Sequence, residues 1–253
     1  MMRAAFAFLA AGLSLMAGGN PARADYPVAP DVVVFCEPTL RHAITDLAAL
    51  WRQDTGVPVR VFTSPTWALL EQVSHRARSD LVIGEGEATA ANAIGRHLVK
   101  PETVRPLWRN ELVVAALASA EPPHLAALAG KAPIAIPDPA TDVAGAEGRK
   151  ALEALGLWDA ASASSISVID TADASYLLAQ GKVRLALLYA TDVAADPSLA
   201  IADRLAPASY APIVYWIAET HHAVSPNTEK FLAFLHEAKA HERLAADGLE
   251  ARP

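Results

Sequence analysis

The chain contains 253 residues, of which 53% are hydrophobic, 19% are charged and one is cysteine. This composition excludes a disordered chain and a small disulfide-stapled domain, and the length is enough for one large or two modest domains. The formal net charge of -7 argues against a nucleic-acid-binding protein, because such proteins usually present a basic face.

The first 24 residues have the pattern of a secretory signal peptide. Arg3 is followed by a mostly apolar run at residues 4–16, and Ala22-Arg23-Ala24 provides the small residues of a signal-peptidase site. We therefore expect residues 1–24 to be removed and the mature protein, beginning near Asp25, to be exported to the periplasm. The apolar run is shorter than the ~20 residues that cross a bilayer, and no later stretch of the sequence approaches that length, so no membrane span is expected after cleavage. An uncleaved membrane anchor is the alternative.

Short apolar strands alternate with helical patterns along the rest of the chain, which is typical of an α/β protein. In the first part we predict strands at residues 31–35, 57–62, 80–84 and 111–117, and helices at residues 40–56, 67–73 and 88–97. In the second part we predict strands at residues 131–136, 167–170, 183–189 and 213–218, and helices at residues 145–155, 173–179 and 225–248. The last helix is expected to begin with Ser225 as its N-cap and Pro226 at its first position.

Two successive βαβ units, with the chain returning to the first near its end, predict two lobes with a hinge between them. We expect residues 25–115 and 212–253 to form the first lobe and residues 116–211 the second. Each lobe would be a mostly parallel sheet flanked by helices, as in bilobed periplasmic ligand-binding proteins that close around a ligand. Periodicity alone does not exclude the alternative of one Rossmann-like sheet.

Two predicted strand ends carry the same Phe-x-x-Pro-Thr sequence. One strand leads into Cys36-Glu37-Pro38-Thr39 and the other into Thr63-Ser64-Pro65-Thr66. In each copy the proline suits the first position of a helix, where its missing N–H costs nothing. Adjacent parallel strands would direct both helix starts into one crevice, where backbone N–H groups and hydroxyls suit an oxyanion. Ordinary capping of the two helices is the alternative.

Several motifs resemble the molybdate-binding proteins of ABC importers. The longest is IAIPDPATDVAGAEGRKALEALGLW at residues 134–158. Further matches are LLYATD at residues 187–192, PIVYWIA at residues 212–218, FLAFL in the last predicted helix, and, in the first lobe, VVF, Asp54-Thr55-Gly56-Val57 and residues 79–83. The resemblance extends over nearly all of the mature chain.

This resemblance implies a type II periplasmic-binding-protein fold that captures molybdate or tungstate and delivers it to an ABC permease in the inner membrane. It implies a monomeric carrier without cofactor and without enzymatic activity. It places the ligand-binding groups at Thr39, at Ser64 or Thr66, at the backbone of Ala144 and Thr171, and at the Tyr189 hydroxyl. A core role for Tyr189 and an N-cap role for Thr171 stay open as alternatives.

Five residues depart from the pattern of that family and could alter specificity. They are Cys36, Glu37, Trp67, Glu85 and Asp142. A carboxylate ~4 Å from an anionic charge costs about 4 kcal/mol at an effective dielectric constant of ~20, and a dianion doubles the cost. An ionised Glu37 facing the ligand would therefore exclude tight molybdate binding. The alternative is the same fold with another ligand, a metal cation or a small organic molecule, since Cys, Glu and Asp are metal ligands. An enzyme on this scaffold is a third hypothesis, but no catalytic motif supports it.

Overall fold

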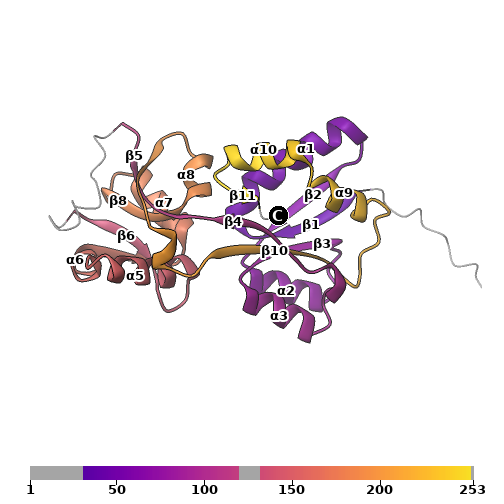
Figure 1. Cartoon of the computed structure of the whole chain (residues 1–253), viewed down its shortest axis with the longest axis horizontal. Helices are drawn as coiled ribbons and strands as arrows, with labels where there is room; N and C mark the ends of the chain where they lie inside the picture. Colours follow the sequence, from indigo (N-terminus) through magenta and orange to yellow (C-terminus); the bar gives the residue numbers. More distant parts are fainter. Residues whose placement is uncertain (1–30, 120–131, 252–253) are drawn as a thin grey trace, which may run out of the picture.

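The computed structural model describes residues 31–119 and 132–251. The predicted signal peptide lies outside these residues. Two mixed sheets form the molecule, and helices cover both faces of each sheet (Figure 1). The prediction of two sheets is therefore confirmed, and the alternative of a single sheet is wrong.

The first sheet has six strands in the order β11-β4-β10-β3-β1-β2. Its strands are β1 (Val32–Cys36), β2 (Val59–Thr63), β3 (Leu81–Glu85), β4 (Arg105–Asn110), β10 (Ile213–Glu219) and β11 (Glu250–Ala251). Its helices are η1 (Pro38–Leu40), α1 (Arg41–Thr55), α2 (Thr66–Ser74), α3 (Glu87–Gly95), η2 (Pro101–Thr103), α9 (Thr228–Phe234) and α10 (Ala238–Ala246). Strand β1 pairs in parallel with β2 and β3, whereas β10 runs antiparallel to β3 and β4.

The second sheet has five strands in the order β7-β6-β8-β5-β9. Its strands are β5 (Leu112–Leu117), β6 (Ile134–Pro137), β7 (Ser165–Val168), β8 (Leu185–Tyr189) and β9 (Leu199–Arg204). Its helices are α5 (Val143–Ala154), α6 (Trp158–Ser164), α7 (Thr171–Ala179), α8 (Ala190–Ala195) and η3 (Pro207–Ser209). The strands β6, β7 and β8 are parallel, and β5 runs antiparallel to both β8 and β9.

The chain crosses between the sheets at two places. Strand β4 ends in the first sheet at Asn110, and β5 begins in the second sheet at Leu112. The chain returns from β9 through η3 to β10, and both crossings run along the middle of the molecule (Figure 1). The predicted lobe boundary at residues 115 and 116 thus falls inside β5, a strand of the second sheet, so the sheets divide the chain near residue 111.

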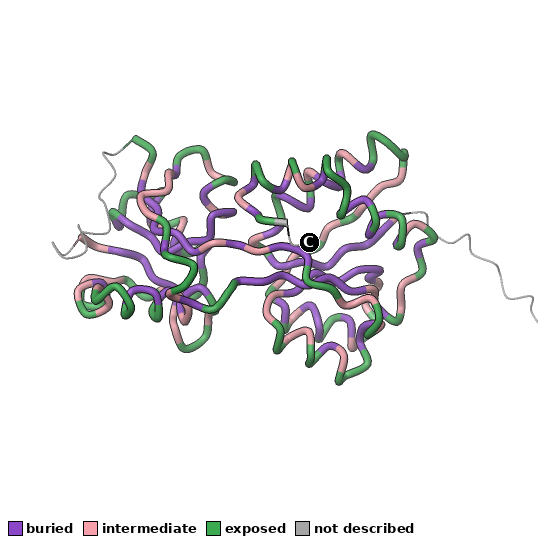
Figure 2. The backbone as a smooth tube through the Cα atoms, viewed as in Figure 1, coloured by how far each residue is buried: buried purple, intermediate pink, exposed green. Residues whose placement is uncertain are grey.

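Alternating side chains of the strands build the core on both faces of each sheet. In β1, Val32, Val34 and Cys36 face the cluster under α1 and α9, whereas Val33 and Phe35 pack in the cluster under α2 and α3. The first of these clusters also continues into the second half of the molecule under α5. The strands are mostly buried and the outer helix faces are exposed (Figure 2). The two halves therefore share one apolar core along the crossing strands.

The single last helix predicted at residues 225–248 is wrong, because the chain forms α9 and α10 there, with Asn227 rather than Ser225 as the N-cap of α9. Phe231 in α9 and Leu244 in α10 are both fully buried. In a straight helix these two side chains would point about 140° apart, toward largely opposite faces. Breaking the helix after Leu235 lets both side chains face the core, where Phe231 and Phe234 pack on Trp51 of α1.

Candidate functional site

The two Phe-x-x-Pro-Thr segments lie side by side, because β1 and β2 are parallel neighbours with Cys36 opposite Thr63. The helix starts differ from the prediction. Pro38 is the first residue of the short helix η1, as expected, but Pro65 is the N-cap of α2 and lies one position before the helix. The side chain of Pro65 has no hydrogen-bond acceptor and cannot cap α2. The first N–H groups of this helix therefore need acceptors from other residues.

Glu37 supplies the acceptor for the start of α2. Its Oε1 accepts a hydrogen bond from the Thr66 backbone N–H at 2.5 Å and a second from the Thr66 hydroxyl. The Glu37 side chain is buried, and burial raises the pKa of its carboxyl; the two hydrogen bonds from Thr66 partly offset the rise, and the charge of Asp142 adds to it. The carboxyl therefore occupies donors that the sequence assigned to a ligand.

Glu85 at the end of β3 joins the two halves of the molecule. Its Oε1 accepts a hydrogen bond of 3.0 Å from the hydroxyl of Tyr189, which ends β8 in the second sheet. Its backbone N–H donates to Thr66 Oγ1 at 2.9 Å. Burial raises the pKa of Glu85 to about 8, helped by the charges of Glu37 and of the second-half aspartates, while the Tyr189 hydrogen bond opposes the rise. We call Glu37, Thr66, Glu85 and Tyr189 the inter-sheet junction.

The second half contributes helix starts that carry their own caps. Asp142 accepts a hydrogen bond from the Gly145 N–H at 3.0 Å, and Asp170 accepts one from the Asp173 N–H at 2.9 Å. Burial raises the pKa of Asp142, and hydrogen bonds from the Gly145 and Ala144 N–H groups offset part of that rise. The predicted donors Ala144 and Thr171 are buried in the first turns of α5 and α7.

Asp192 was not predicted as a site residue, although it lies within the LLYATD motif. It accepts a hydrogen bond from the Tyr189 backbone N–H at 2.9 Å. Burial raises the pKa of Asp192 to about 6, and hydrogen bonds from Tyr189 and from the Thr171 side chain oppose the rise. Asp192 therefore fixes the end of β8, where Tyr189 contacts Glu85.

The other predicted residues lie in different surroundings. Cys36 is fully buried in the core, and burial raises the pKa of its thiol, so it is not a free metal ligand at the junction. Trp67 is 70% exposed and projects from the first turn of α2 into solvent. Ser64 is half-buried and its N–H donates to the Cys36 carbonyl at 3.2 Å. Arg41, which was not predicted, donates to the Thr63 hydroxyl and places a guanidinium at the end of β2.

Thr39 belongs to a hydrogen-bond network that the sequence did not reveal. Its Oγ1 lies 2.9 Å from the hydroxyl of Tyr215 in β10. Asn110 Nδ2 lies 3.0 Å from the same hydroxyl and 2.9 Å from Thr191 Oγ1 in α8. Tyr215 is part of the PIVYWIA motif, but nothing in the sequence places Asn110 beside it. Through the Tyr215 hydroxyl, Thr39 is therefore connected to Asn110, which lies where the chain crosses between the two sheets.

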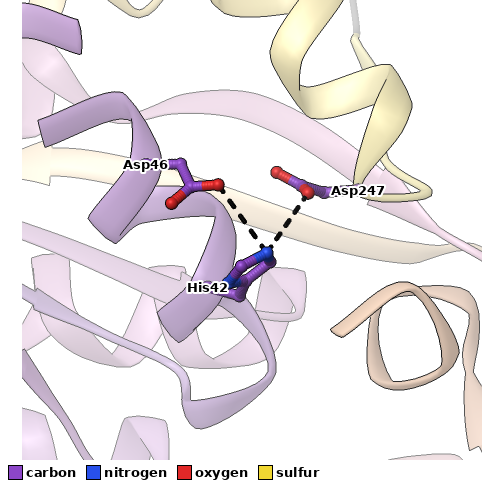
Figure 3. A group of neighbouring side chains, drawn as sticks. All are labelled: His42, Asp46 and Asp247. Atoms are coloured by element: carbon purple, nitrogen blue, oxygen red, sulfur yellow. Dashed lines mark ion pairs between the residues drawn. The ribbon is translucent and has the colours of Figure 1, made fainter. Parts of the chain in front are cut away.

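A separate group of side chains has the composition of a metal site. His42 Nε2 lies 3.6 Å from Asp46 Oδ2 on α1 and 3.8 Å from Asp247 Oδ1 at the end of α10 (Figure 3). Arg243 Nη2 donates to both carboxylates, to Asp247 Oδ1 at 2.9 Å and to Asp46 Oδ2. Because the guanidinium already neutralises these oxygens, the group holds α10 on α1 as an ion-pair network. In the described part of the chain it is the one cluster of three His, Cys, Asp or Glu side chains with ligand atoms this close.

Comparisons with known proteins agree with this architecture. Residues 32–250 match the model of a family described as bacterial extracellular solute-binding proteins. The molybdate-binding protein ModA of Escherichia coli K12 is 24% identical over 243 residues, which cover 93% of each chain.

Two solved structures have the same fold. The substrate-binding domain of a putative molybdenum ABC transporter from Clostridium difficile has a TM-score of 0.75 at 18% identity, over 88% of this chain and 99% of that chain. The periplasmic molybdate-binding protein of Azotobacter vinelandii has a TM-score of 0.74 at 20% identity, over 88% and 100%. Among the described residues, no helix has the length and apolar character needed to cross a membrane.

Proposed function

Because the chain belongs to the family of bacterial extracellular solute-binding proteins, we propose that it is a periplasmic carrier of a small tetrahedral oxyanion, with molybdate and tungstate as first candidates. It binds the anion between its two halves and delivers it to an ABC permease of the inner membrane. The signal-peptide pattern of residues 1–24 supports export, and the relatives' names support the anion and the transporter. It acts as a monomeric carrier without cofactor or covalent chemistry, and its closed form binds the ligand more tightly than its open form.

The main support for this proposal is that two hydrogen-bond donors of the inter-sheet junction already bind carboxyl oxygens. The Thr66 N–H at the start of α2 and the Tyr189 hydroxyl at the end of β8 each donate to a carboxyl oxygen of the chain itself. Carboxylate and oxyanion oxygens accept the same hydrogen bonds, and a helix start favours negative charge. The two carboxyl groups thus stand where oxygens of a bound anion would be held.

Anion binding then requires Glu37 and Glu85 to leave these donors or to bind a proton. Two negative charges ~4 Å apart repel by about 4 kcal/mol at an effective dielectric constant of ~20, so an ionised carboxylate would oppose the ligand. Burial raises the pKa of both carboxyl groups, that of Glu85 to about 8. A protonated carboxyl does not repel the anion and can donate a hydrogen bond to it. We therefore expect tighter anion binding at lower pH.

A metal cation is less well supported as the ligand. The thiol of Cys36 is fully buried in the core, and burial raises its pKa, which disfavours the thiolate that a metal would bind. The carboxylates beside His42 are held by Arg243. No observation in the described residues specifically favours a small organic molecule.

Isothermal titration calorimetry of the mature protein, from Asp25 onward, with sodium molybdate, tungstate and sulfate tests the proposal. We expect saturable binding of molybdate or tungstate at micromolar concentration, tighter at pH 6 than at pH 8. Tyr189→Phe should weaken it about tenfold or more, since a hydrogen bond to a charged group is lost. Tyr210→Phe is the matched control, because its hydroxyl accepts from the Leu112 N–H outside the junction. Absence of saturable heat with all three anions would contradict the proposal.

A further inference from the structure

We propose that Tyr215 and Asn110 are positioning residues that turn the Thr39 hydroxyl into a hydrogen-bond donor toward the bound oxyanion. This inference rests on the proposed function, because it assigns a role in anion binding. It adds two buried residues that do not themselves contact the ligand.

The orientation of the Asn110 side chain determines which atoms donate at one end of the hydrogen-bond network. Asn110 Oδ1 accepts a hydrogen bond of 3.0 Å from the Glu111 backbone N–H, and a backbone N–H can only donate. The amide oxygen is therefore fixed on that side, and Nδ2 faces the hydroxyls of Tyr215 and Thr191. Asn110 thus donates one N–H to each of them.

The donor role of Asn110 determines how the Tyr215 hydroxyl is oriented. It accepts from Asn110, so its own proton needs a different acceptor, and Tyr215 is fully buried, where an unpaired hydroxyl is costly. Among the described residues, Thr39 Oγ1 is the other polar atom within hydrogen-bond distance of this hydroxyl, at 2.9 Å. Tyr215 therefore donates to Thr39.

Thr39 is left with its own proton free to donate. Its side chain is only partly buried, in contrast to the full burial of Tyr215, so a ligand can reach it. The pairing of β10 with β4 shifts register between Tyr215 and Trp216, an irregularity that redirects side chains. The hydroxyl of Thr39 is thus prepared as a donor before an anion arrives.

The same network connects the donor to the relative position of the two halves. Asn110 is the last residue of β4 in the first sheet, next to the crossing into β5. Its second N–H binds Thr191 of α8, which packs on the second sheet. A hinge movement that separates α8 from β4 would release this contact, whereas the Glu111 N–H would keep the Asn110 amide oriented. The Asn110–Thr191 contact therefore links the network that orients Thr39 to the second half of the molecule.

A double-mutant cycle read by calorimetry with sodium molybdate tests the inference. Thr39→Val should weaken binding about tenfold or more, and Tyr215→Phe about three- to tenfold. In the Thr39→Val background, Tyr215→Phe should weaken it no further, because it acts through the missing hydroxyl. Thr39→Ser, which keeps the hydroxyl, should bind within about threefold of the wild type, and Tyr210→Phe should bind like the wild type. An equal loss from Tyr215→Phe in both backgrounds, or no loss in either, would overturn the inference.

A ligand-free measurement separates this inference from the proposed function. Carbon-13 NMR of protein labelled at the tyrosine ring carbon that bears the hydroxyl reports on Tyr215, whose signal is assigned by elimination with Phe variants of the other tyrosines. The signal should move in Thr39→Val, which removes the acceptor of the Tyr215 proton. If wild-type protein binds no molybdate but the signal moves, the function fails and the network stands. An unmoved signal overturns the network whether or not molybdate binds. Because this measurement does not use the Tyr215→Phe variant, it still tests the network if that variant does not fold.

Discussion

Helix α2 in the first half and helices α5 and α7 in the second half begin in contrasting ways. Asp142 and Asp170 directly precede α5 and α7, and each accepts the N–H of a residue three positions later. Helix α2 follows Pro65, which offers no side-chain cap, and receives the carboxyl of Glu37 from 29 residues earlier in the chain. One half caps its helices locally, and the other takes a cap from a different segment.

The difference separates a fixed framework from an exchangeable set of donors. A local N-cap is part of the helix start and contributes to stability wherever the helix forms. A carboxyl that reaches over from another segment can rotate away and leave its donors to another anion. We therefore expect changes in the second-half caps to affect stability, and changes at Glu37 and Glu85 to affect anion binding and pH dependence.

The largest expected effect is a gain of anion affinity in Glu37→Ser. The substitution removes a carboxyl whose ionised form would oppose the anion, and it frees the Thr66 N–H and hydroxyl. Affinity for molybdate should rise on the order of 100-fold, somewhat less than the ~4 kcal/mol of unscreened repulsion. Calorimetry measures the change, and Glu87→Ser, at an exposed glutamate in the first turn of α3, controls for net charge. Equal affinities of the two variants would show that Glu37 does not oppose anion binding.

The second effect is a loss of stability as the pH rises, caused by Glu85. An unfolded glutamate releases its proton near pH 4.5, but the folded protein holds it up to about pH 8, so the folded state binds more protons between these values. The melting temperature should fall by about 3 °C or more between pH 6.5 and 8.5, the shift that about 1 kcal/mol causes in a protein of this size.

The variant Glu85→Gln should flatten this dependence, since its amide oxygen can still accept from Tyr189. Asp192→Asn should keep it, because the Asp192 window, from 3.8 to about 6, lies below the measured range. Thermal melts monitored by circular dichroism give both results. A wild-type slope in Glu85→Gln would assign the pH dependence to another group.

A smaller effect is expected from the local caps. Asp170→Ala removes the acceptor of the Asp173 N–H at the start of α7 and should lower the free energy of unfolding by about 1 kcal/mol. Urea denaturation measures the change. Asp170→Asn, which retains a capping oxygen, should stay within about 0.5 kcal/mol of the wild type. If both variants lose the same stability, the charge of Asp170 rather than its capping contact would be responsible.

The smallest effect concerns Trp67, the residue of the α2 start that points away from the junction. Its side chain is 70% exposed, so Trp67→Ala should change the free energy of unfolding by no more than about 0.5 kcal/mol and leave molybdate affinity unchanged. Urea denaturation and calorimetry on the same sample check both. A large loss of affinity would show that Trp67 turns inward when the anion binds.

Much of the fold could be predicted because apolar periodicity reports directly on burial. Strands β1, β3 and β8 are continuous apolar runs in the sequence and are buried in the structure. Strand β4 escaped prediction because Arg105 and Pro106 break its pattern, although Leu107 and Trp108 are fully buried. The break between α9 and α10 depends on which part of the core each apolar side chain contacts. The periodicity of a single segment does not give this information.

The candidate site was predictable in its location but not in its contacts. The repeated Phe-x-x-Pro-Thr sequence identified two neighbouring strand ends, and β1 and β2 are indeed adjacent. The direction of Glu37 depends on Thr66 and that of Glu85 on Tyr189, 104 residues away. Such pairings arise only when the sheets are assembled, so sequence spacing could not distinguish a carboxyl that repels the ligand from one that occupies its donors.

If the chain's own carboxyl groups occupy donors that otherwise bind an anion, a crystal structure of the mature protein with molybdate will show the exchange. Anomalous scattering locates molybdenum without reference to the protein. We expect the molybdenum atom between the two halves, its oxygens within hydrogen-bond distance of the Thr66 N–H and the Tyr189 hydroxyl, and Glu37 turned away from Thr66. Molybdenum bound elsewhere, with Glu37 still on Thr66 and Glu85 still on Tyr189, would contradict this expectation.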